Sequence, residues 1–331
     1  MIASKFPRDD VERHRDRDDS STPPSGQHTR GLRLCGPVGF LVFGVFLVAV
    51  FSKQLFSLAV YAAGQDLHSH ILLIPFVSAY LIYIRRDALP RDYTFSVGWA
   101  LIPLIAGAIS LAAAWTPDVF GRPLSQNDYL GLMALSFVCF VAAGGFFFLG
   151  RKWMAAAAFP FAFLIFMVPM PDRVADFLET ASKLASADAA SMFFNISGTP
   201  VLRDGVFFHL SNITLEVAQE CSGIRSSWVL LITSLLAANM FLKKPWRRTV
   251  LVAAVIPLGI LRNGLRIVFI GLLCVHGGPE MINSIFHRRG GPPFFVLSLI
   301  PLFFLLWWLR RGEDGRESEG RRPRAEVKGD R

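Results

Sequence analysis

A cysteine, two arginines and several histidines are the residues of this sequence whose chemistry and spacing could form a catalytic site. Cys221 lies in "AQECSGIRSS", where a polar, acidic segment meets the apolar run "WVLLITSLLAANMFL". A thiol with an ordinary pKa of about 8.5 becomes a nucleophile when a helix N-terminus or a nearby cation lowers that pKa. The position of Cys221, just before the apolar run, predicts that it lies at a helix N-terminus. Gly223 follows it and would let another segment approach closely.

The two arginines lie in a second apolar run, "TVLVAAVIPLGILRNGLRIVFIGLL". Their spacing of four residues puts Arg262 and Arg266 on one helix face, one turn apart, with Asn263 close to Arg266. Ionisable side chains within membrane spans are costly and usually functional. We expect Arg266 to lie at about the depth of Cys221, with Arg262 deeper. An arginine there could donate to the oxyanion that forms when a thiolate attacks a carbonyl group.

Histidines that could serve as general base and acid occur in two predicted loops. His276 and His287 bracket the segment "HGGPEMINSIFH", and His68 and His70 belong to "DLHSH". A simpler interpretation stays open for each of these residues. The cysteine could be a small packing residue, the arginines could contact backbone or headgroups, and the histidines could be ordinary surface residues.

The elements that must position these residues are membrane helices. Hydrophobic residues make up 53% of the chain, which contains 30 phenylalanines, and charges gather at both ends and in short gaps between apolar runs. A spanning helix needs about 20 apolar residues. The sequence therefore predicts an all-α integral membrane protein with about eight spans, at 38–62, 71–84, 98–114, 129–149, 154–170, 224–242, 249–275 and 293–309.

Lysine and arginine in the short loops set the predicted orientation. They concentrate in "RRDALPR", "RK" and "KKPWRR", which follow the second, fourth and sixth spans. These loops and both termini are expected to face the cytoplasm, and Cys221 and the histidines the outside. The long gap 171–223 contains an amphipathic helix, "DRVADFLETASKLASADAASMFF", and a strand-like pair, "GVFFHL" and "ITLEVAQ". We expect this segment to be an outer cap lying on the membrane before the sixth span.

Composition also bounds the domains and partners. Residues 1–35 and 310–331 are expected to be disordered cytoplasmic tails that flank one membrane domain at 36–309. Four scattered cysteines argue against a disulfide framework or a metal site, and no cofactor is expected. The net charge of +9 is explained by membrane orientation and lipid headgroups and requires no nucleic acid.

Several of these motifs resemble those of the exosortase/archaeosortase family. "VAQECSGIRSS" is similar to the family's Cys-Ser-Gly-hydrophobic-Arg signature, which includes Ser222, and "RNGLRI" to its Asn-x-x-Arg element, which places Arg266 at the family's arginine. "HRRGGPPFF" resembles the histidine element with His287, and "HSHILLIPFVSAYLIYIRR" and "MVPMP" resemble two further elements. Ile71 stands where the family usually has glycine after Ser-His. The resemblance covers roughly residues 65–300.

This resemblance implies a bacterial multi-pass cysteine peptidase and transpeptidase of the cytoplasmic (inner) membrane, with its active site facing outside. It implies Cys221 as nucleophile, Arg266 as oxyanion donor and His287 as general base and acid. The substrates would be exported proteins with a C-terminal tail of a Pro-Glu-Pro motif, a hydrophobic span and a basic end, often in cells that make exopolysaccharide. An unknown acceptor would receive the cleaved protein. Second candidates for the site are Arg262, Asn263, Ser222, Gly223, His70 and His276.

Two alternatives from other functional classes remain. In the first, the protein is a membrane transporter that binds an anionic substrate at Arg262 and Arg266 with the help of Asn263. Transporters often contain internal repeats, and the sequence has no convincing one. In the second, the protein is a scaffold subunit for polysaccharide export, in which no single one of these residues matters.

Overall fold

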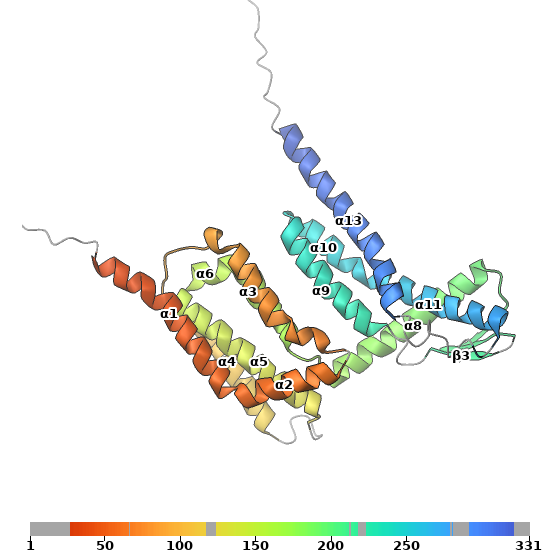
Figure 1. Cartoon of the computed structure of the whole chain (residues 1–331), viewed down its shortest axis with the longest axis horizontal. Coiled ribbons are helices and arrows are strands. Elements are labelled where there is room, and N and C mark those ends of the chain that lie inside the picture. The colour runs from red at the N-terminus through yellow and green to blue at the C-terminus, as the bar shows by residue number, and fades with distance from the viewer. Residues whose placement is uncertain are drawn as a thin grey trace, which may run out of the picture.

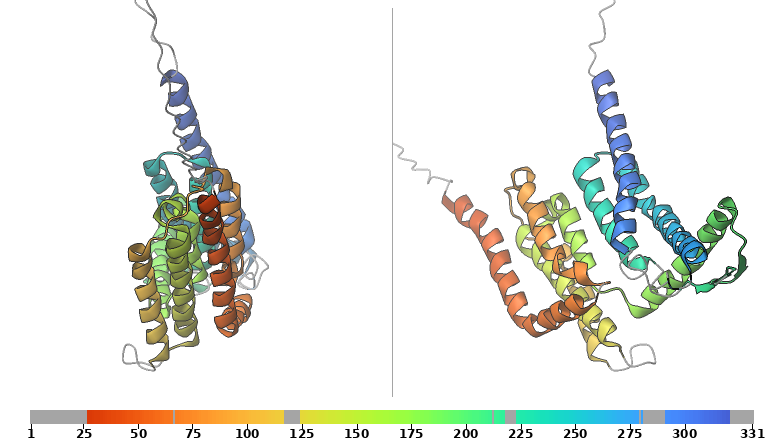
Figure 2. Two further views of the ribbon diagram at one scale, coloured as in Figure 1. Left: turned by 90° about the vertical axis from the view of Figure 1, so that its left-hand side faces the viewer. Right: turned by 45° about the vertical axis from the view of Figure 1, so that its right-hand side comes forward.

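The computed structural model describes residues 27–65, 67–116, 124–211, 213–217, 223–278, 280 and 291–320. The described chain is predominantly helical (Figure 1). Its first part, α1 to α7, and its last part, α9 to α13, form two groups of helices that the helix α8 connects (Figures 1 and 2). The prediction of an all-α protein is confirmed in this part of the chain.

The helices of the first group are short or broken in several places. α1 and α2 are bent by 70° at Phe51, and the π-helix η3 ends at Gly150, which has a φ of 87°. Ser125 caps α5, because its Oγ accepts a hydrogen bond of 3.0 Å from the Asp128 amide. The bounds are α1 Gln27–Val50, α2 Ser52–Gly64, η1 Ser69–Leu72, α3 Ile74–Ile84, η2 Arg86–Ala88, α4 Val97–Trp115, α5 Gln126–Gly144, η3 Gly145–Leu149, α6 Arg151–Ala156, α7 Ala158–Phe163 and η4 Leu164–Met167.

The second group consists of α9, α10, α11 and α13, which follow the cap formed by α8 and the three strands. Pro245 begins α10, where its missing amide proton costs nothing. The bounds are α8 Asp172–Ile196, β1 Leu202–Asp204, β2 Phe207–His209, β3 Thr214–Glu216, α9 Ile224–Phe241, α10 Pro245–Ala253, α11 Val255–Gly277 and α13 Gly291–Gly320. α1 and α13 thus extend beyond the predicted domain limits of 36 and 309, and those limits stay a prediction.

The predicted count of eight spans is not confirmed. Among the described residues, five helices are long and apolar enough to cross a membrane, and a sixth if the bent pair α1 and α2 counts as one span. The predicted spans 71–84 and 154–170 correspond to shorter apolar helices, Ile74–Ile84 and Ala158–Met167. All eight predicted segments are therefore helical, but their length does not establish that each one crosses.

The three basic gaps lie at one end of the helices. Arg85, at the end of α3, donates through Nη2 to the side-chain and backbone oxygens of Asn239 near the end of α9. Glu313 of α13 accepts hydrogen bonds from the amides of Lys243 and Lys244, at 3.0 and 2.9 Å. The Arg151 amide donates to Ser96 at the start of α4. The ends of α3, α9 and α13 and the starts of α4, α6 and α10 are thus on one side.

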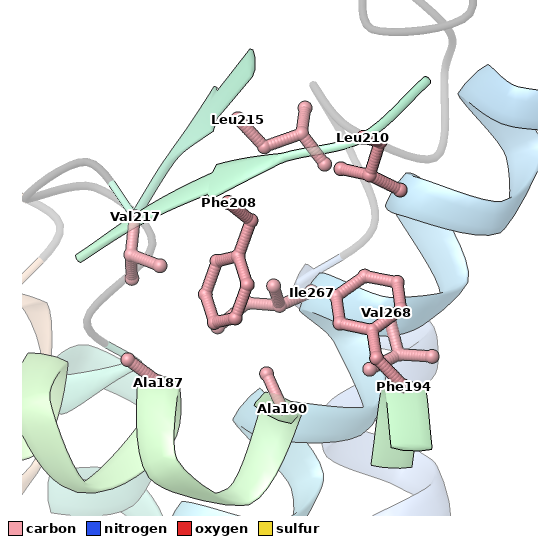
Figure 3. Close-up of a cluster of buried hydrophobic side chains, with 9 residues drawn as sticks. All are labelled: Ala187, Ala190, Phe194, Phe208, Leu210, Leu215, Val217, Ile267 and Val268. Atoms are coloured by element: carbon pink, nitrogen blue, oxygen red, sulfur yellow. The ribbon is translucent and has the colours of Figure 1, made fainter. Parts of the chain in front are cut away.

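The cap packs on α11 through a small apolar core. α8 crosses α11 (Figures 1 and 2), and β1, β2 and β3 form an antiparallel sheet over the other side of the cluster (Figure 3). Phe208 pairs with Arg203 and Leu215 in the sheet, and its ring packs on Phe194. The predicted helix and strand pair are confirmed, whereas β1 was not predicted. The cluster consists of Ala187, Ala190, Phe194, Phe208, Leu210, Leu215, Val217, Ile267 and Val268.

α8 has two different faces, and one of them exposes apolar side chains. Its side toward α11 carries small residues, and Gly264 lets α8 approach so closely that an added Cβ would lie 2.8 Å from the Cβ of Ala189. The opposite side carries four apolar side chains that are 37% to 71% exposed, Val174, Phe177, Leu178 and Leu184. This two-sided pattern fits a helix that packs on protein with one face and on lipid with the other. That the cap lies on the membrane stays a prediction.

Candidate active site at the start of helix α9

The site is built around Gly223, the residue that precedes the first turn of α9. Gly223 has a φ of 71°, a left-handed conformation that disfavours residues with a Cβ. Its carbonyl oxygen accepts three hydrogen bonds, from the Ser227 amide at 3.0 Å, from Ser226 Oγ at 3.2 Å and from Arg262 Nη2 at 3.0 Å. The turn that leads into α9 is thereby tied both to its own helix and to α11.

Arg262 makes the contact from α11, and its side chain is only 6% exposed. Nη2 also lies 3.3 Å from Ser227 Oγ. Nη1 is buried and has no hydrogen-bond partner within the described part of the chain. We expected Arg262 to lie deeper than the start of α9, but its guanidinium reaches the level of Gly223.

Arg266 and Asn263 share the neighbourhood of Arg262. The guanidinium groups of Arg262 and Arg266 repel each other, as their spacing of one helical turn predicts. Asn263 is 2% exposed, and its Cγ would lie 3.1 Å from a Cβ added to Gly223. Arg266 is half-buried. The positive face of α11 is therefore turned toward the interior of the protein rather than toward lipid.

Small residues allow α9 and α11 to approach at this point. A Cβ added to Gly223 would lie 2.9 Å from Arg262 Nη2, and one added to Gly259 would lie 2.6 Å from Ser227 Oγ. Contacts between the two helices thus require both glycines. Gly223 lies one turn before Ser227 in α9, and Gly259 lies one turn before Arg262 in α11. The close approach brings the buried guanidinium of Arg262 against the positive end of the α9 helix dipole.

Among the described histidines, His70 has a contact with α9. Its Nε2 accepts a hydrogen bond from the Trp228 indole N–H at 3.2 Å, and Trp228 packs edge-on against Phe166. Burial, and secondarily the neighbouring His68, lowers the pKa of His70 below its ordinary value of 6.5. The neutral ring with Nε2 as acceptor is therefore the form that this environment favours.

His68 occupies a second polar cluster beside His70. Burial lowers its pKa, and the carboxylate of Asp172 opposes that shift. Asp172 in turn accepts a hydrogen bond from Asn127 Nδ2 at 2.8 Å, and its amide donates to Asp128 at 3.0 Å. This cluster joins the first residue of α8 to the start of α5.

His276 is placed away from this group. It is exposed in the last turn of α11, ten residues after Arg266, and its Nδ1 lies 2.9 Å from the Leu272 carbonyl oxygen of its own helix. Ten residues of α-helix correspond to about 15 Å. The geometry does not favour His276 as a partner of the residues at the start of α9.

Three site residues predicted from the sequence, Cys221, Ser222 and His287, lie outside the described residues. Of the others, Arg262, Asn263 and Gly223 come together, His70 reaches the first turns of α9 through Trp228, and Arg266 is one turn from Arg262.

Sequence analysis missed Trp228, Ser227 and Gly259. Ser227 and Trp228 lie four and five residues after Gly223, in the first turns of the helix that the site precedes. The only signal for them was this position, since their contacts are made with residues far away in the sequence.

Comparison with known proteins agrees with the motifs. The family model of the transmembrane exosortases matches residues 60–304, which is most of the chain and includes every predicted site residue. No curated protein and no solved structure matches the chain.

Proposed function

The chain belongs to the transmembrane exosortase family, and we propose that it is a membrane cysteine peptidase and transpeptidase. It cleaves the C-terminal sorting tails of exported proteins, of the kind with a Pro-Glu-Pro motif, a hydrophobic span and a basic end. The family is linked to the processing of proteins with sorting tails. The activity of this chain, its substrates and its acceptor are part of the proposal.

One observation carries the assignment most directly, the contact between Arg262 and the Gly223 carbonyl oxygen. Gly223 follows Cys221 by two residues in the chain, and covalent geometry limits the separation of their Cα atoms to about 7.6 Å. The contact therefore joins the cysteine signature to the arginine face of α11, two elements that are far apart in the sequence. A cation close to a cysteine lowers the pKa of its thiol, and the buried guanidinium of Arg262 contacts the cysteine signature at Gly223.

The proposed reaction has two acyl transfers. The Cys221 thiolate attacks the scissile carbonyl carbon, and the resulting oxyanion is stabilised by Arg266. The intermediate collapses when the C–N bond breaks and the leaving amine takes a proton from the general acid. A thioester on Cys221 remains, and an acceptor amine, another nucleophile or water attacks it and returns the sulfur to the thiolate.

His287 is proposed as the general acid and base, by its match to the histidine element of the family. His70 is the alternative that the described contacts support, since it approaches α9 and its Nε2 is an acceptor. In this role, the Trp228 hydrogen bond would have to be exchanged for one to the reacting group. The conformation described here therefore makes His70 a positioning residue for α9.

The proposed location is the bacterial inner membrane, with both termini in the cytoplasm and the start of α9 outside. The separation of the basic gaps from the cap supports this orientation, because the two sets of residues lie at opposite ends of the same helices. A tail anchored in the membrane by its own hydrophobic span would then present its cleavage motif at the level of α9.

The experiment is a processing assay in cells that contain the protein and one exported protein with such a tail. Loss of the tail is followed as a change in mass of the substrate. We expect Cys221→Ala and Arg266→Ala to abolish processing while both variants still insert into the membrane.

The matched controls are Cys139→Ala and Cys274→Ala, because both are free cysteines within helices of the same protein. Each control should process the substrate at the wild-type rate. Normal processing by Cys221→Ala would overturn the proposed mechanism and return attention to the transporter alternative.

A further inference from the structure

Arg262 uses only part of its hydrogen-bonding capacity within the described chain. Nη2 donates to the Gly223 carbonyl oxygen and lies near Ser227 Oγ, whereas Nη1 is buried and has no partner there. A buried guanidinium N–H without an acceptor is costly, because water no longer solvates it. Nη2 of Arg262 thus holds the start of α9, whereas Nη1 has no acceptor among the described residues.

The charge of Arg262 is also uncompensated among these residues. The ion pairs Arg86–Asp87, Arg203–Asp188 and Arg247–Glu313 involve other arginines. Arg266 carries a like charge that repels the guanidinium of Arg262. The start of α9 adds the partial positive charge of a helix N-terminus. Arg262, Arg266 and the start of α9 therefore all contribute positive potential to this region.

We propose that Arg262 is a substrate-binding residue that accepts a carboxylate against the first turn of α9. The carboxylate would receive a hydrogen bond from Nη1 and neutralise the charge that the described residues leave unbalanced. This role differs from that of Arg266, which belongs to the Asn-x-x-Arg element and is assigned to the oxyanion. Arg262 contributes specificity for an acidic side chain.

The source of the carboxylate is an acidic residue of the substrate peptide close to the cleaved bond. This step rests on the proposed function, because that function places the peptide beside Cys221 and hence beside Gly223. A carboxylate suits the guanidinium better than a carbonyl oxygen does. It is planar like the guanidinium, and its negative charge compensates the positive charge of Arg262.

The binding experiment uses the purified full-length protein in detergent and measures its thermal midpoint. The probes are N-acetylglutamate and its neutral isostere N-acetylglutamine. We expect N-acetylglutamate to raise the midpoint of the wild type and of Cys221→Ala, and N-acetylglutamine to have no comparable effect. Arg262→Gln should lose the response, and Arg262→Lys should retain part of it, because lysine keeps the charge but not the fork.

The Arg262→Lys variant and one control keep this test interpretable if Arg262→Gln folds poorly. Arg151→Gln removes an arginine that stacks on Trp99 at the opposite end of the helices, and its response should match that of the wild type. Equal shifts with both probes, no shift in the wild type, or an unchanged shift in Arg262→Gln would each overturn the proposal.

A second arm tests the source of the anion in the processing assay with purified components. Replacing the acidic residue nearest the cleaved bond by its amide should raise KM roughly tenfold or more in the wild type, with little effect on kcat. The same replacement should have no further effect in Arg262→Gln and a smaller effect in Arg262→Lys than in the wild type. Full additivity of the two changes would contradict recognition by Arg262.

The two proposals fail in distinguishable ways. If N-acetylglutamate binds through Arg262 but Cys221→Ala still processes the tail, the anion site stands and the cysteine mechanism falls. If Cys221 is required but glutamate and glutamine probes behave alike, the mechanism stands and the role of Arg262 falls.

Discussion

Gly223 shows how one residue can connect a sequence signature to its chemistry. Its left-handed φ turns the chain into α9, its carbonyl oxygen receives the Arg262 guanidinium, and its missing Cβ leaves room for Arg262 and Asn263. A larger residue would have to solve a conformational and a steric problem together. The glycine of this signature is therefore required by the geometry that brings α9 to α11.

Gly223→Ala should abolish processing or reduce it at least tenfold. An alanine in the left-handed conformation costs about 1–2 kcal/mol, and its Cβ would lie 2.9 Å from Arg262 Nη2. The control is Gly198→Ala, because Gly198 has a similar φ of 69° but open space around it. Gly198→Ala should lower the thermal midpoint by a few degrees and leave processing intact. Similar processing by both variants would show that the contact with α11 is unimportant.

The buried histidines should make stability depend on pH. Burial lowers the pKa of His68 and His70 below 6.5 in the folded protein, so the unfolded chain binds protons at a higher pH than the folded chain does. The free energy of unfolding must then fall as the pH decreases through 6.5. The measurement is the thermal midpoint in detergent between about pH 8 and pH 5.

The double variant His68→Gln, His70→Gln should show a shallower decrease over this range than the wild type. His276→Gln is the control, since His276 is exposed at the end of α11, and its slope should equal that of the wild type. An unchanged slope in the double variant would contradict the effect of burial.

At the scale of elements, hydrogen bonds from buried side chains join the helices at the end opposite to the site. Glu313 of α13 caps the start of α10 through two backbone amides, and Arg247 of α10 donates to the carbonyl oxygens of Leu309 and Gly312. Glu313 and Arg247 are 4% and 5% exposed. Because these contacts join α13 to α10, they fix the far end of the pair α10 and α11 that carries the arginines.

Glu313→Ala should destabilise the protein by about 3 kcal/mol, the lower end of the cost of breaking a buried charge pair. The lower end applies because Arg247 keeps its two carbonyl acceptors. Thermal unfolding in detergent provides the measurement, and Arg310→Ala, an exposed arginine in the same helix, provides the control. A thermal midpoint for Glu313→Ala equal to that of Arg310→Ala would show that the hydrogen bonds of Glu313 do not stabilise the protein.

The elements that follow from local sequence were the predictable ones. The apolar runs predicted the helices, the 3.6-residue period predicted α8, and the apolar segments around Ser211 predicted β2 and β3. The 70° bend at Phe51 has no proline or glycine to announce it. The contacts of Gly223 with Arg262 and of His70 with Trp228 join residues 39 and 158 positions apart, so only tertiary packing determines them.

At the scale of the whole molecule, the helices place basic loops at one end and the cap with the start of α9 at the other. α13 continues beyond the other helices at the basic end (Figures 1 and 2). By the positive-inside rule, we propose that this end faces the cytoplasm. The proposed function requires this orientation, since an exported protein is available only at the outer face.

Cysteine labelling in intact cells tests the orientation. In a background without native cysteines, Asp204→Cys in the cap sheet should react with a membrane-impermeant maleimide from outside. Asp87→Cys, whose parent side chain is 89% exposed in η2, should react only after the membrane is permeabilised. The reverse labelling pattern would show that the protein has the opposite orientation in the membrane, and cleavage at the outer face would then be excluded.

The most direct test of the central claim is to trap the acyl intermediate on the enzyme. The protein is isolated with its tailed substrate, and the covalent adduct is identified by mass before and after treatment with hydroxylamine, which cleaves thioesters. We predict an adduct of the tail-less substrate that is released by hydroxylamine and absent from Cys221→Ala. Tail loss in Cys221→Ala, or an adduct that persists in that variant, would contradict thioester chemistry at Cys221.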